Sequence, residues 1–396
     1  MITPIIRVED IIGLLPDDLL DHLSFTHRVD YSVKKLKGKI VFKLFLYAFL
    51  TSRTISLRIL AAIYNSDKFK NLFNVPKKMI QHSGIGFRLS TINYHYFENI
   101  FSYLLHSHHL DAILFAHKKV AISKIDSTIV TLSSKLLKVG LDDNPGKKTL
   151  KFGVEMSEGI PVNIMLFKGQ SYLSEDNALP KLIMQRKQKR AFNIAIFDRG
   201  IQRKQSFVDF HRQGVYFISR LSTQKVKVLK NLPVAQKDTG TLTIMKDEVI
   251  AFASREGMGR ETAGTEFRLV TGNNKETHQE IKFLTNVYTL SATEIADLYK
   301  SRWEIETFFK FIKQELNFSH LLSRSENGIK VVMYMTMITA ILLTIYKKLN
   351  KIIGWAVAKI KFLDELESWI MHDWRVEIAP AFNYHHQQFF FQLRGP

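Results

Sequence analysis

Two apolar runs that each close on an aspartate constrain the fold of this chain more than any other feature of its sequence. Val120 to Asp126 reads VAISKID, and Phe192 to Asp198 reads FNIAIFD. Short apolar runs of this length are typical of strands buried inside a sheet. Functional groups often lie at the ends of such strands, so Asp126 and Asp198 are candidate site residues. A turn former or helix cap is the alternative role for an aspartate that ends a strand.

Strands and helices alternate around these two runs, which predicts an α/β domain that begins at Lys118. Two segments joined by Ser157 to Ile160 predict a hairpin, which would give three antiparallel strands together with the first run. Short alternating stretches after Ser222 predict a β-rich insertion. The expected elements are strands at 150–156 and 161–167, a helix at 174–190, a helix to Arg212, a strand at 215–220 and the insertion at 222–288.

The region before Lys118 predicts helices, with apolar residues at helical spacing over 39–50 and 56–64 and a further helix capped by Ser90 after Gly84 and Gly86. That last helix could enter a DNA groove, and a bundle that only packs on the rest of the protein is the alternative. The apolar stretch Val331 to Tyr346 is shorter than a membrane span requires and predicts a buried helix.

The charge balance points to a polyanionic partner. The chain of 396 residues has 56 Lys and Arg against 37 Asp and Glu, a formal net charge of +19. Nucleic acid fits best, because dispersed cations neutralise many phosphates and release their counterions. A basic surface without a ligand and an anionic membrane surface are the alternatives. The chain has no cysteine, which excludes disulfides and Cys-ligated metals. No secretory signal is evident at the N-terminus, so we expect a cytoplasmic protein.

A predicted helix from Ser291 to about Asn317 carries a row of polar residues. It starts with a capping box of Ser291 and Glu294. At about 100° per residue, Tyr299, Arg302, Glu306 and Lys313 fall within an arc of roughly 60° beside an apolar sector. The alternative is a solvated face with ordinary ion pairs, such as Glu306 with Lys310.

These residues resemble the cut-and-paste DDE transposases of the fourth insertion-sequence family, which belong to the RNase H-like, retroviral-integrase superfamily. Four signatures carry the resemblance, which covers about Lys118 to Leu343. They are Ile125-Asp126-Ser127-Thr128, Ile196-Phe197-Asp198-Arg199-Gly200, Phe283-Leu284-Thr285-Asn286 and the series Tyr299, Arg302, Glu306 and Lys313.

The resemblance implies a DNA transposase in which Asp126, Asp198 and Glu306 hold two Mg²⁺ ions, with Mn²⁺ as a substitute. Cations held by carboxylate oxygens would support cleavage at the transposon ends and then transfer of the freed 3'-OH into target DNA. No catalytic Ser or Cys is required, and Ser127 and Thr128 are expected to make hydrogen bonds at the end of the strand.

The resemblance also implies which residues bind DNA. Tyr299, Arg302 and Lys313 would contact phosphates near the transposon end. Trp303 would stack on an extruded base, with core packing as its alternative. Further expected DNA contacts are Arg199, Arg186, Lys187, Lys189 and Arg190, the last four of which could instead form a solvated helix end. The histidine groups at 106–109 and 385–386 lack a third-ligand pattern, so we expect no His-bound metal.

The implied fold is an RNase H-like α/β core, a mixed five-stranded sheet flanked by helices and interrupted by the β-rich insertion. The implied partner is double-stranded DNA, bound by a homodimer in the bacterial cytoplasm and nucleoid, with no membrane. A metal-dependent nuclease without strand transfer and an inactive DNA-binding descendant are the alternatives. The expected domains are 1–117 (helical, DNA-binding), 118–221 (first part of the core), 222–288 (insertion), 289–350 (second part of the core) and 351–396 (C-terminal helical).

Overall fold

The chain folds into two compact units that alternate along the sequence. Unit 1 comprises residues 1–117 and 311–396, and unit 2 comprises residues 118–310. The structure is a computed structural model that describes residues 6–106, 121–132, 140–144, 147–185, 193–221, 225–234, 238–253, 262, 264–320 and 322–376. The five domains expected from the sequence are functional assignments and stay predictions.

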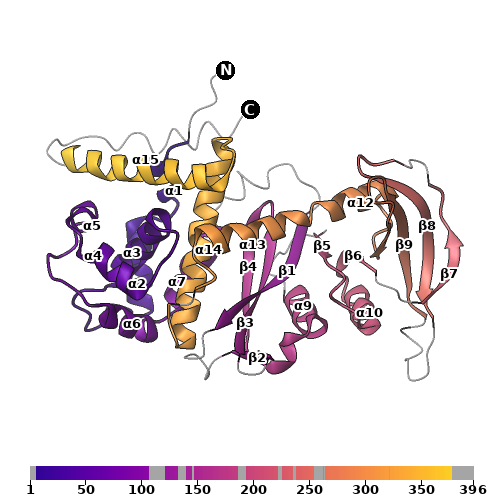
Figure 1. Ribbon diagram of the computed structural model, residues 1–396, viewed down its shortest axis with the longest axis horizontal. Helices are drawn as coiled ribbons and strands as arrows, with labels where there is room; N and C mark the ends of the chain where they lie inside the picture. The colour runs from indigo at the N-terminus through magenta and orange to yellow at the C-terminus, as the bar shows by residue number, and fades with distance from the viewer. Residues whose placement is uncertain are drawn as a thin grey trace, which may run out of the picture. The chain divides into compact units, whose positions relative to one another are not determined.

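Unit 1 is built from helices, as its apolar spacing predicts (Figure 1). Its central helix packs on α1, α3, α6, α7 and α15. That helix, α14, is long and apolar enough to cross a membrane, yet 94% of its apolar window is buried inside the protein. The predicted buried helix over 331–346 is therefore confirmed. The helices are α1 (Val8–Ile12), α2 (Asp17–Thr26), α3 (Gly38–Thr51), α4 (Leu57–Asn65), α5 (Asp67–Leu72), α6 (His82–Thr91), α7 (His95–His106), α14 (Glu326–Leu349) and α15 (Trp355–Val376).

The predicted helix capped by Ser90 is wrong. Helix α6 already begins at His82 and contains Gly84 and Gly86. Ser90 lies in its last turn, where its hydroxyl donates to the carbonyl of Phe87 at 2.7 Å. The small residue at 86 has a packing role, because a Cβ there would lie 3.2 Å from a methyl group of Leu57 on α4. The two helices thus come together where the sequence suggested a helix boundary.

Unit 2 is organised around one mixed sheet. Among the described residues its ten strands follow the order β2-β3-β1-β5-β6-β10-β9-β8-β7, with β4 paired to β3. The strands are β1 (Ala121–Leu132), β2 (Leu141–Asn144), β3 (Lys147–Ser157), β4 (Ile160–Phe167), β5 (Asn193–Phe197), β6 (Tyr216–Arg220), β7 (Val226–Asn231), β8 (Leu242–Phe252), β9 (Glu266–Asn274) and β10 (Glu280–Thr285).

The pairing pattern confirms the predicted hairpin and enlarges the predicted sheet. Strand β3 is antiparallel to both β1 and β4, whereas β1, β5 and β6 run parallel. The sheet exceeds five strands because β10 pairs with the remaining edge of β6, and β9, β8 and β7 follow. The predicted insertion is β-rich, and its strands continue the same sheet.

Helices cover both faces of this sheet, as Figure 1 shows for α9, α10 and α12. Helices α9 (Glu175–Met184) and α10 (Lys204–Arg212) pack on one apolar cluster, which includes Ile125, Ala195 and Phe197. Helix α12 (Ala292–Lys300) packs on the other face, which includes Ile194 and Ile196. Because side chains alternate along a strand, residues 122, 124 and 126 of β1 face the same side as residues 194 and 196 of β5.

The single helix predicted from Ser291 to about Asn317 is wrong, because the structure has two helices there. The capping box of Ser291 and Glu294 starts α12, and α13 (Trp303–Glu315) begins after a turn at Ser301 and Arg302. The amides of Arg302 and Ile305 donate to carbonyls three residues back, at 3.0 Å each. This tighter hydrogen-bond pattern interrupts the α-helix.

Candidate active site

Strand register brings the two candidate aspartates to adjacent positions. Strands β1 and β5 pair in parallel from Ala121 with Asn193 to Lys124 with Ile196, an offset of 72 positions. Asp126 and Asp198 have the same offset, so each lies two residues beyond the last pair, Asp126 within β1 and Asp198 directly after β5. Strand β1 continues to Leu132. The prediction that Asp126 ends its strand is therefore wrong, and the end of β5 rather than β1 opens the site.

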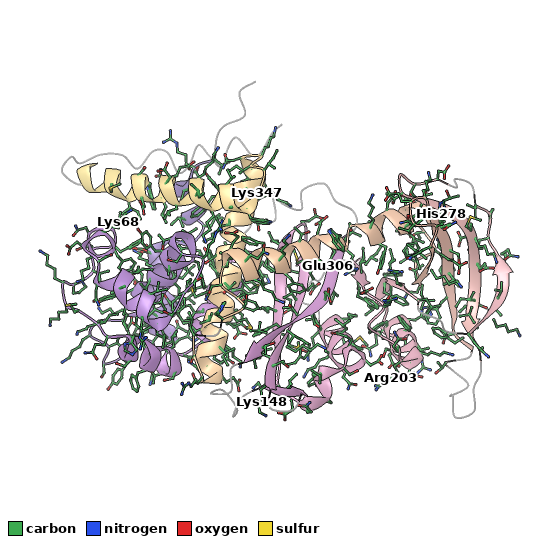
Figure 2. All side chains as sticks on the ribbon, in the orientation of Figure 1. Lys68, Lys148, Arg203, His278, Glu306 and Lys347 are labelled. Carbon is green, nitrogen blue, oxygen red and sulfur yellow. The ribbon has the colours of Figure 1, made fainter. Side chains whose placement is uncertain are left out.

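Arg302 joins two of the three predicted acids. Its Nη2 lies 2.5 Å from Oε1 of Glu306, and its Nη1 lies 3.7 Å from Oδ2 of Asp126. The side chain is buried, and its Nε has no hydrogen-bond partner among the described residues. Glu306 therefore pairs with the residue one turn before it, and this contact takes the place of the alternative pair with Lys310. Figure 2 labels Glu306 on α13.

Tyr299 contacts the third acid. Its hydroxyl donates to Oδ1 of Asp198 at 3.1 Å, and the guanidinium carbon of Arg302 lies 5.7 Å from the centre of its ring. Burial and the neighbouring Asp198 raise the pKa of the Tyr299 hydroxyl, which keeps that proton available for donation. Tyr299, Arg302 and Glu306 thus place a hydroxyl, a guanidinium and a carboxylate beside the two aspartates.

The surroundings of Asp126 destabilise its ionised form. Burial, and to a smaller extent the neighbouring carboxylates of Glu175 and Asp198, raise the pKa of Asp126, which lies at about 6 when all contacts are included. The amide of Ser127, which donates to Oδ1 at 2.7 Å, and the cation of Arg302 lower it. Desolvation outweighs these favourable contacts, so the site carries a carboxylate whose charge is incompletely compensated.

A charged network behind Asp126 was not predicted from the sequence. The fully buried Lys151 on β3 lies 2.8 Å from Oε1 of Glu175, the first residue of α9, and also donates to the carbonyl of Leu173. The same Oε1 accepts the hydroxyl of Ser127 at 2.7 Å. The hydrogen bonding predicted for Ser127 is confirmed, but the residue lies inside β1 and not at the strand end that was predicted. The sequence signal for the network is weak: a lysine between the apolar residues Leu150 and Phe152 of β3.

A second ion pair connects β1 to the start of α13. The Nζ of Lys124, which is buried, lies 2.9 Å from Oε2 of the half-exposed Glu304. Because Lys124 faces the same side of the sheet as Asp126, this pair helps to hold the helix that carries Glu306 against the strand that carries Asp126.

The Phe283 to Asn286 signature contributes no ligand to the carboxylates: the ring of Phe283 packs on Tyr299, with 5.1 Å between the ring centres, and the next residues hold two strands together. The hydroxyl of Thr285 donates to the carbonyl of Phe217, and the side chain of Asn286 bonds both the amide of Phe217 and the carbonyl of Val215. These contacts fix the end of β10 beside β6.

The remaining predicted site residues differ in how they are placed. Trp303 is 66% exposed, so the core-packing alternative for this residue is wrong. Arg199 is exposed next to Asp198. Lys313 is half-buried in the part of α13 that belongs to unit 1, and burial lowers its pKa. Arg186, Lys187, Lys189 and Arg190 lie outside the described residues, as do His108, His109, His385 and His386.

The carboxylates at this site are suitable ligands for a hard cation, but their present arrangement leaves no position for one among them. Carboxylate oxygens are the ligands that Mg²⁺ and Mn²⁺ prefer. Across the described part of the chain, no three acidic or histidine side chains are grouped so that they could hold an ion as they stand. The guanidinium of Arg302 occupies the position between Asp126 and Glu306.

Comparison with known proteins gives a family for this arrangement. The family described as the transposase DDE domain matches residues 125–343, which include Asp126, Asp198 and Glu306. A relative from Synechocystis sp., named as a transposase for insertion sequence element IS4SA, is 28% identical over 57% of this chain and 60% of its own length.

Two further relatives carry similar names. One from Geobacillus stearothermophilus, named as a transposase for insertion sequence element IS5377, is 25% identical over 56% of this chain and 52% of its own length. The transposase y4zB of Sinorhizobium fredii is 28% identical over 40% of this chain and 43% of its own length. The chain thus spans about half the length of the curated relatives it matches.

Proposed function

Since the chain belongs to the transposase DDE domain family, we propose that it is an insertion-sequence transposase that cleaves DNA at the element's ends and joins the freed 3'-OH to target DNA. The observation that carries the proposal is the arrangement of Asp126, Asp198 and Glu306 around Arg302 and Tyr299. These three acids are far apart in the sequence, and one arginine and one tyrosine contact all of them.

The topology of unit 2 supports an RNase H-like core. Strands β4, β3, β1, β5 and β6 follow one another in the sheet, the first three antiparallel and the last three parallel. The parallel connections run through α9 and α10, which cover one face. In this proposal β7 to β10 form the insertion, and α12 and α13 return the chain to the core with Glu306.

The three carboxylates are proposed as ligands of two divalent cations, Mg²⁺ or Mn²⁺. When bound, such cations lower the pKa of a water molecule and neutralise charge that develops on phosphate oxygens. The chemistry of the donors fits, and Asp126 carries the incompletely compensated charge that a cation would offset. For Glu306 and Asp126 to become ligands, the ion pairs that Arg302 makes with them have to open.

Arg302 is proposed to move from these acids to a DNA phosphate. A guanidinium forms strong paired hydrogen bonds with phosphate oxygens, and the Nε of Arg302 is a buried donor without a partner among the described residues. Tyr299 orients Asp198 through its hydroxyl. The exposed ring of Trp303 is available to stack on an unpaired base. Lys313 and Arg199 are proposed as further phosphate contacts.

Double-stranded DNA is the proposed partner, with the element's terminal inverted repeats and a target site as its two substrates. The net charge of +19 supports a polyanionic ligand. In unit 1, some lysines of the basic N-terminal region are already paired, since Lys39 contacts Asp17 and Asp21 and Lys68 contacts Glu367. A homodimer is proposed for the DNA-bound state, because two ends must be joined.

A joining reaction tests this function. The protein is incubated with Mg²⁺, a target plasmid and short duplexes carrying the sequences that flank its coding region, already cleaved at the 3' end. We expect duplex joined to plasmid, and cutting without joining would instead support a nuclease. Glu306→Gln should abolish cleavage while retaining duplex binding. Asp297→Asn is the matched control, since it removes a carboxylate charge from an exposed position of the preceding helix α12. Full activity of Glu306→Gln would contradict the proposal.

A further inference from the structure

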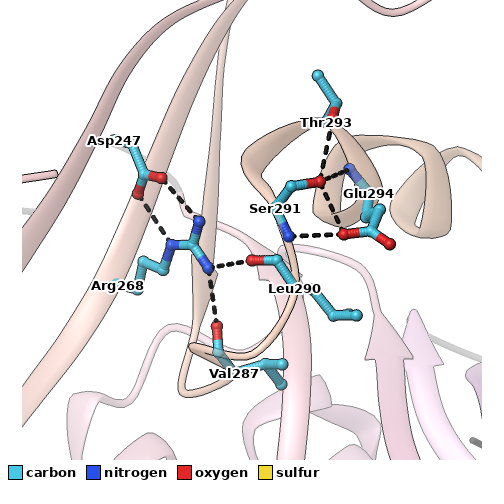
Figure 3. A network of polar contacts seen from close by, with 7 residues as sticks. All are labelled: Asp247, Arg268, Val287, Leu290, Ser291, Thr293 and Glu294. Carbon is cyan, nitrogen blue, oxygen red and sulfur yellow. Dashed lines mark hydrogen bonds and ion pairs between the residues drawn. The ribbon is translucent and has the colours of Figure 1, made fainter. Parts of the chain in front are cut away.

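A buried ion pair in unit 2 lies outside the site described above. The carboxylate of Asp247 on β8 accepts two hydrogen bonds from Arg268 on β9, from Nε to Oδ1 at 2.9 Å and from Nη2 to Oδ2 at 2.7 Å (Figure 3). Both side chains are almost completely buried, with 6% of Arg268 and 2% of Asp247 exposed. In the register of the two strands, Asp247 is opposite Val270 and Arg268 is opposite Val249, so the pair lies diagonally on one face.

The third nitrogen of this guanidinium reaches a different part of the chain. Nη1 of Arg268 donates to the carbonyls of Val287 and Leu290 at 3.2 and 2.6 Å. These carbonyls belong to residues 286–291, the loop that leads from β10 to α12, and Figure 3 shows the loop beside the ion pair. The next residue, Ser291, caps α12. Arg268 therefore holds the loop immediately before the helix begins.

Helix α12 also packs on strands of the insertion. Its residues Ile295, Ala296 and Tyr299 share one apolar cluster with Ile244 of β8 and Val270 of β9. Tyr299 lies at the far end of the same helix, where it contacts Asp198, and Arg302 follows in the next turn. A shift of one residue in the start of α12 would rotate Tyr299 by about 100° around the helix axis. The position of the loop therefore decides whether Tyr299 and Arg302 meet the aspartates.

Stability alone gives no reason for a buried pair here. Removing two charges from water is costly, and replacement of such a pair by apolar side chains of similar volume is often neutral or stabilising. Apolar side chains could not, however, hold the two loop carbonyls. All three nitrogens of Arg268 have partners, in contrast to Arg302, whose Nε has none among the described residues.

We propose that Asp247 and Arg268 are positioning residues: the pair anchors the loop before α12 to the insertion and thereby sets Tyr299, Arg302 and Glu306 against Asp126 and Asp198. The consequence for activity rests on the proposed function, whereas the anchoring itself does not. The β-rich insertion then has a role within its own chain, as the support for the helices that complete the site.

The test measures anchoring and activity separately in the full-length protein. The main variant is the double substitution Asp247→Leu with Arg268→Met, which keeps the volume and removes the donors. Arg268→Lys keeps a cation beside Asp247 but cannot make the paired hydrogen bonds of the guanidinium. It replaces the double variant in the test if that variant does not fold. Lys282→Met is the matched control, because it removes an exposed ion pair with Glu280 on the neighbouring strand β10.

Amide hydrogen exchange reports anchoring, and nicking of a supercoiled plasmid in Mn²⁺ reports activity. In the double variant we expect exchange of residues 287–296 to rise at least tenfold, with β1 and β5 unchanged, and the nicking rate at saturating DNA to fall at least tenfold at unchanged KM. Arg268→Lys should lie between this variant and the wild type.

Unchanged exchange over 287–296 in both Arg268 variants would overturn the anchor, whether or not the protein cuts DNA. Raised exchange with an unchanged nicking rate would overturn the proposal that the Asp247–Arg268 pair positions the site residues. An inactive wild type would refute the proposed function alone, and the exchange data would still decide whether Arg268 anchors the loop.

Discussion

Replacing Asp126 with Asn should inactivate the protein and at the same time stabilise unit 2. Burial and neighbouring carboxylates raise the pKa of Asp126 from 3.8 to about 6. A folded-state pKa above the unfolded value means that the ionised form is less favourable in the folded protein. At pH 7.5 this difference of about two pKa units corresponds to at most about 3 kcal/mol of lost stability.

The carboxamide introduced by Asp126→Asn would retain an acceptor for the Ser127 amide while removing the charge. Because the pKa of Asp126 is raised in the folded protein, the stability difference between variant and wild type depends on pH. The stabilising contribution of Asp126 is fully present below pH 3.8 and is lost as the pH rises through about 6. The advantage of Asp126→Asn should therefore be about 3 kcal/mol at pH 7.5 and below about 1 kcal/mol at pH 4.

The assay is hydrogen exchange of the β1 and β5 amides across a urea series, because these strands report the opening of unit 2. The control is Asp142→Asn, which removes an exposed ion pair with Lys148 and should change stability by less than about 1 kcal/mol. Mg²⁺ should narrow the difference, since a cation that binds only the wild type stabilises it by about 1.4 kcal/mol at ten times its dissociation constant. A variant that is less stable than the wild type at pH 7.5 without metal would refute this reasoning.

Three further predictions address Arg302, Trp303 and Lys359. Arg302→Met removes the cation beside Asp126 and Glu306, so Mn²⁺ binding without DNA should tighten on the order of tenfold in calorimetry, while DNA cleavage falls. Weaker Mn²⁺ binding would contradict the proposal that Arg302 leaves these acids when the cation binds. Trp303→Ala should leave the unfolding free energy within about 0.5 kcal/mol, because the ring is exposed, and slow single-turnover cleavage about tenfold; a large loss of stability would show a packing role. Burial lowers the pKa of Lys359 to about 8, so the charged side chain destabilises the folded protein at pH 7. In urea unfolding, the stability of the wild type relative to Lys359→Met should rise by about 2 kcal/mol between pH 7 and pH 9.5, as Lys359 loses its proton. A stability difference that does not change with pH would exclude a buried charge.

The local pattern of the sequence determined several strands of unit 2 and some of their connections. The strands that contain the apolar runs before Asp126 and Asp198, the hairpin between β3 and β4 and the capping box at Ser291 depend on neighbouring residues, so they can be predicted from spacing and side-chain type. The spacing of Tyr299, Arg302 and Glu306 predicted one polar row on a single helix, whereas Tyr299 lies on α12, Arg302 in the following turn and Glu306 on α13. The turn at Ser301 was missed, because the row of polar residues continues through it.

Only the tertiary structure decided which charged groups from distant segments meet. Lys151 contacts Glu175, and Asp247 contacts Arg268, across 24 and 21 positions of sequence, and each pair depends on how separate strands and helices come together. The register between β1 and β5 sets Asp126 beside Asp198, and a shift of one residue would turn either side chain to the opposite face of the sheet. Arginine has the same donors at 268 and 302; only the folded surroundings saturate the first with partners and leave the Nε of the second without one among the described residues.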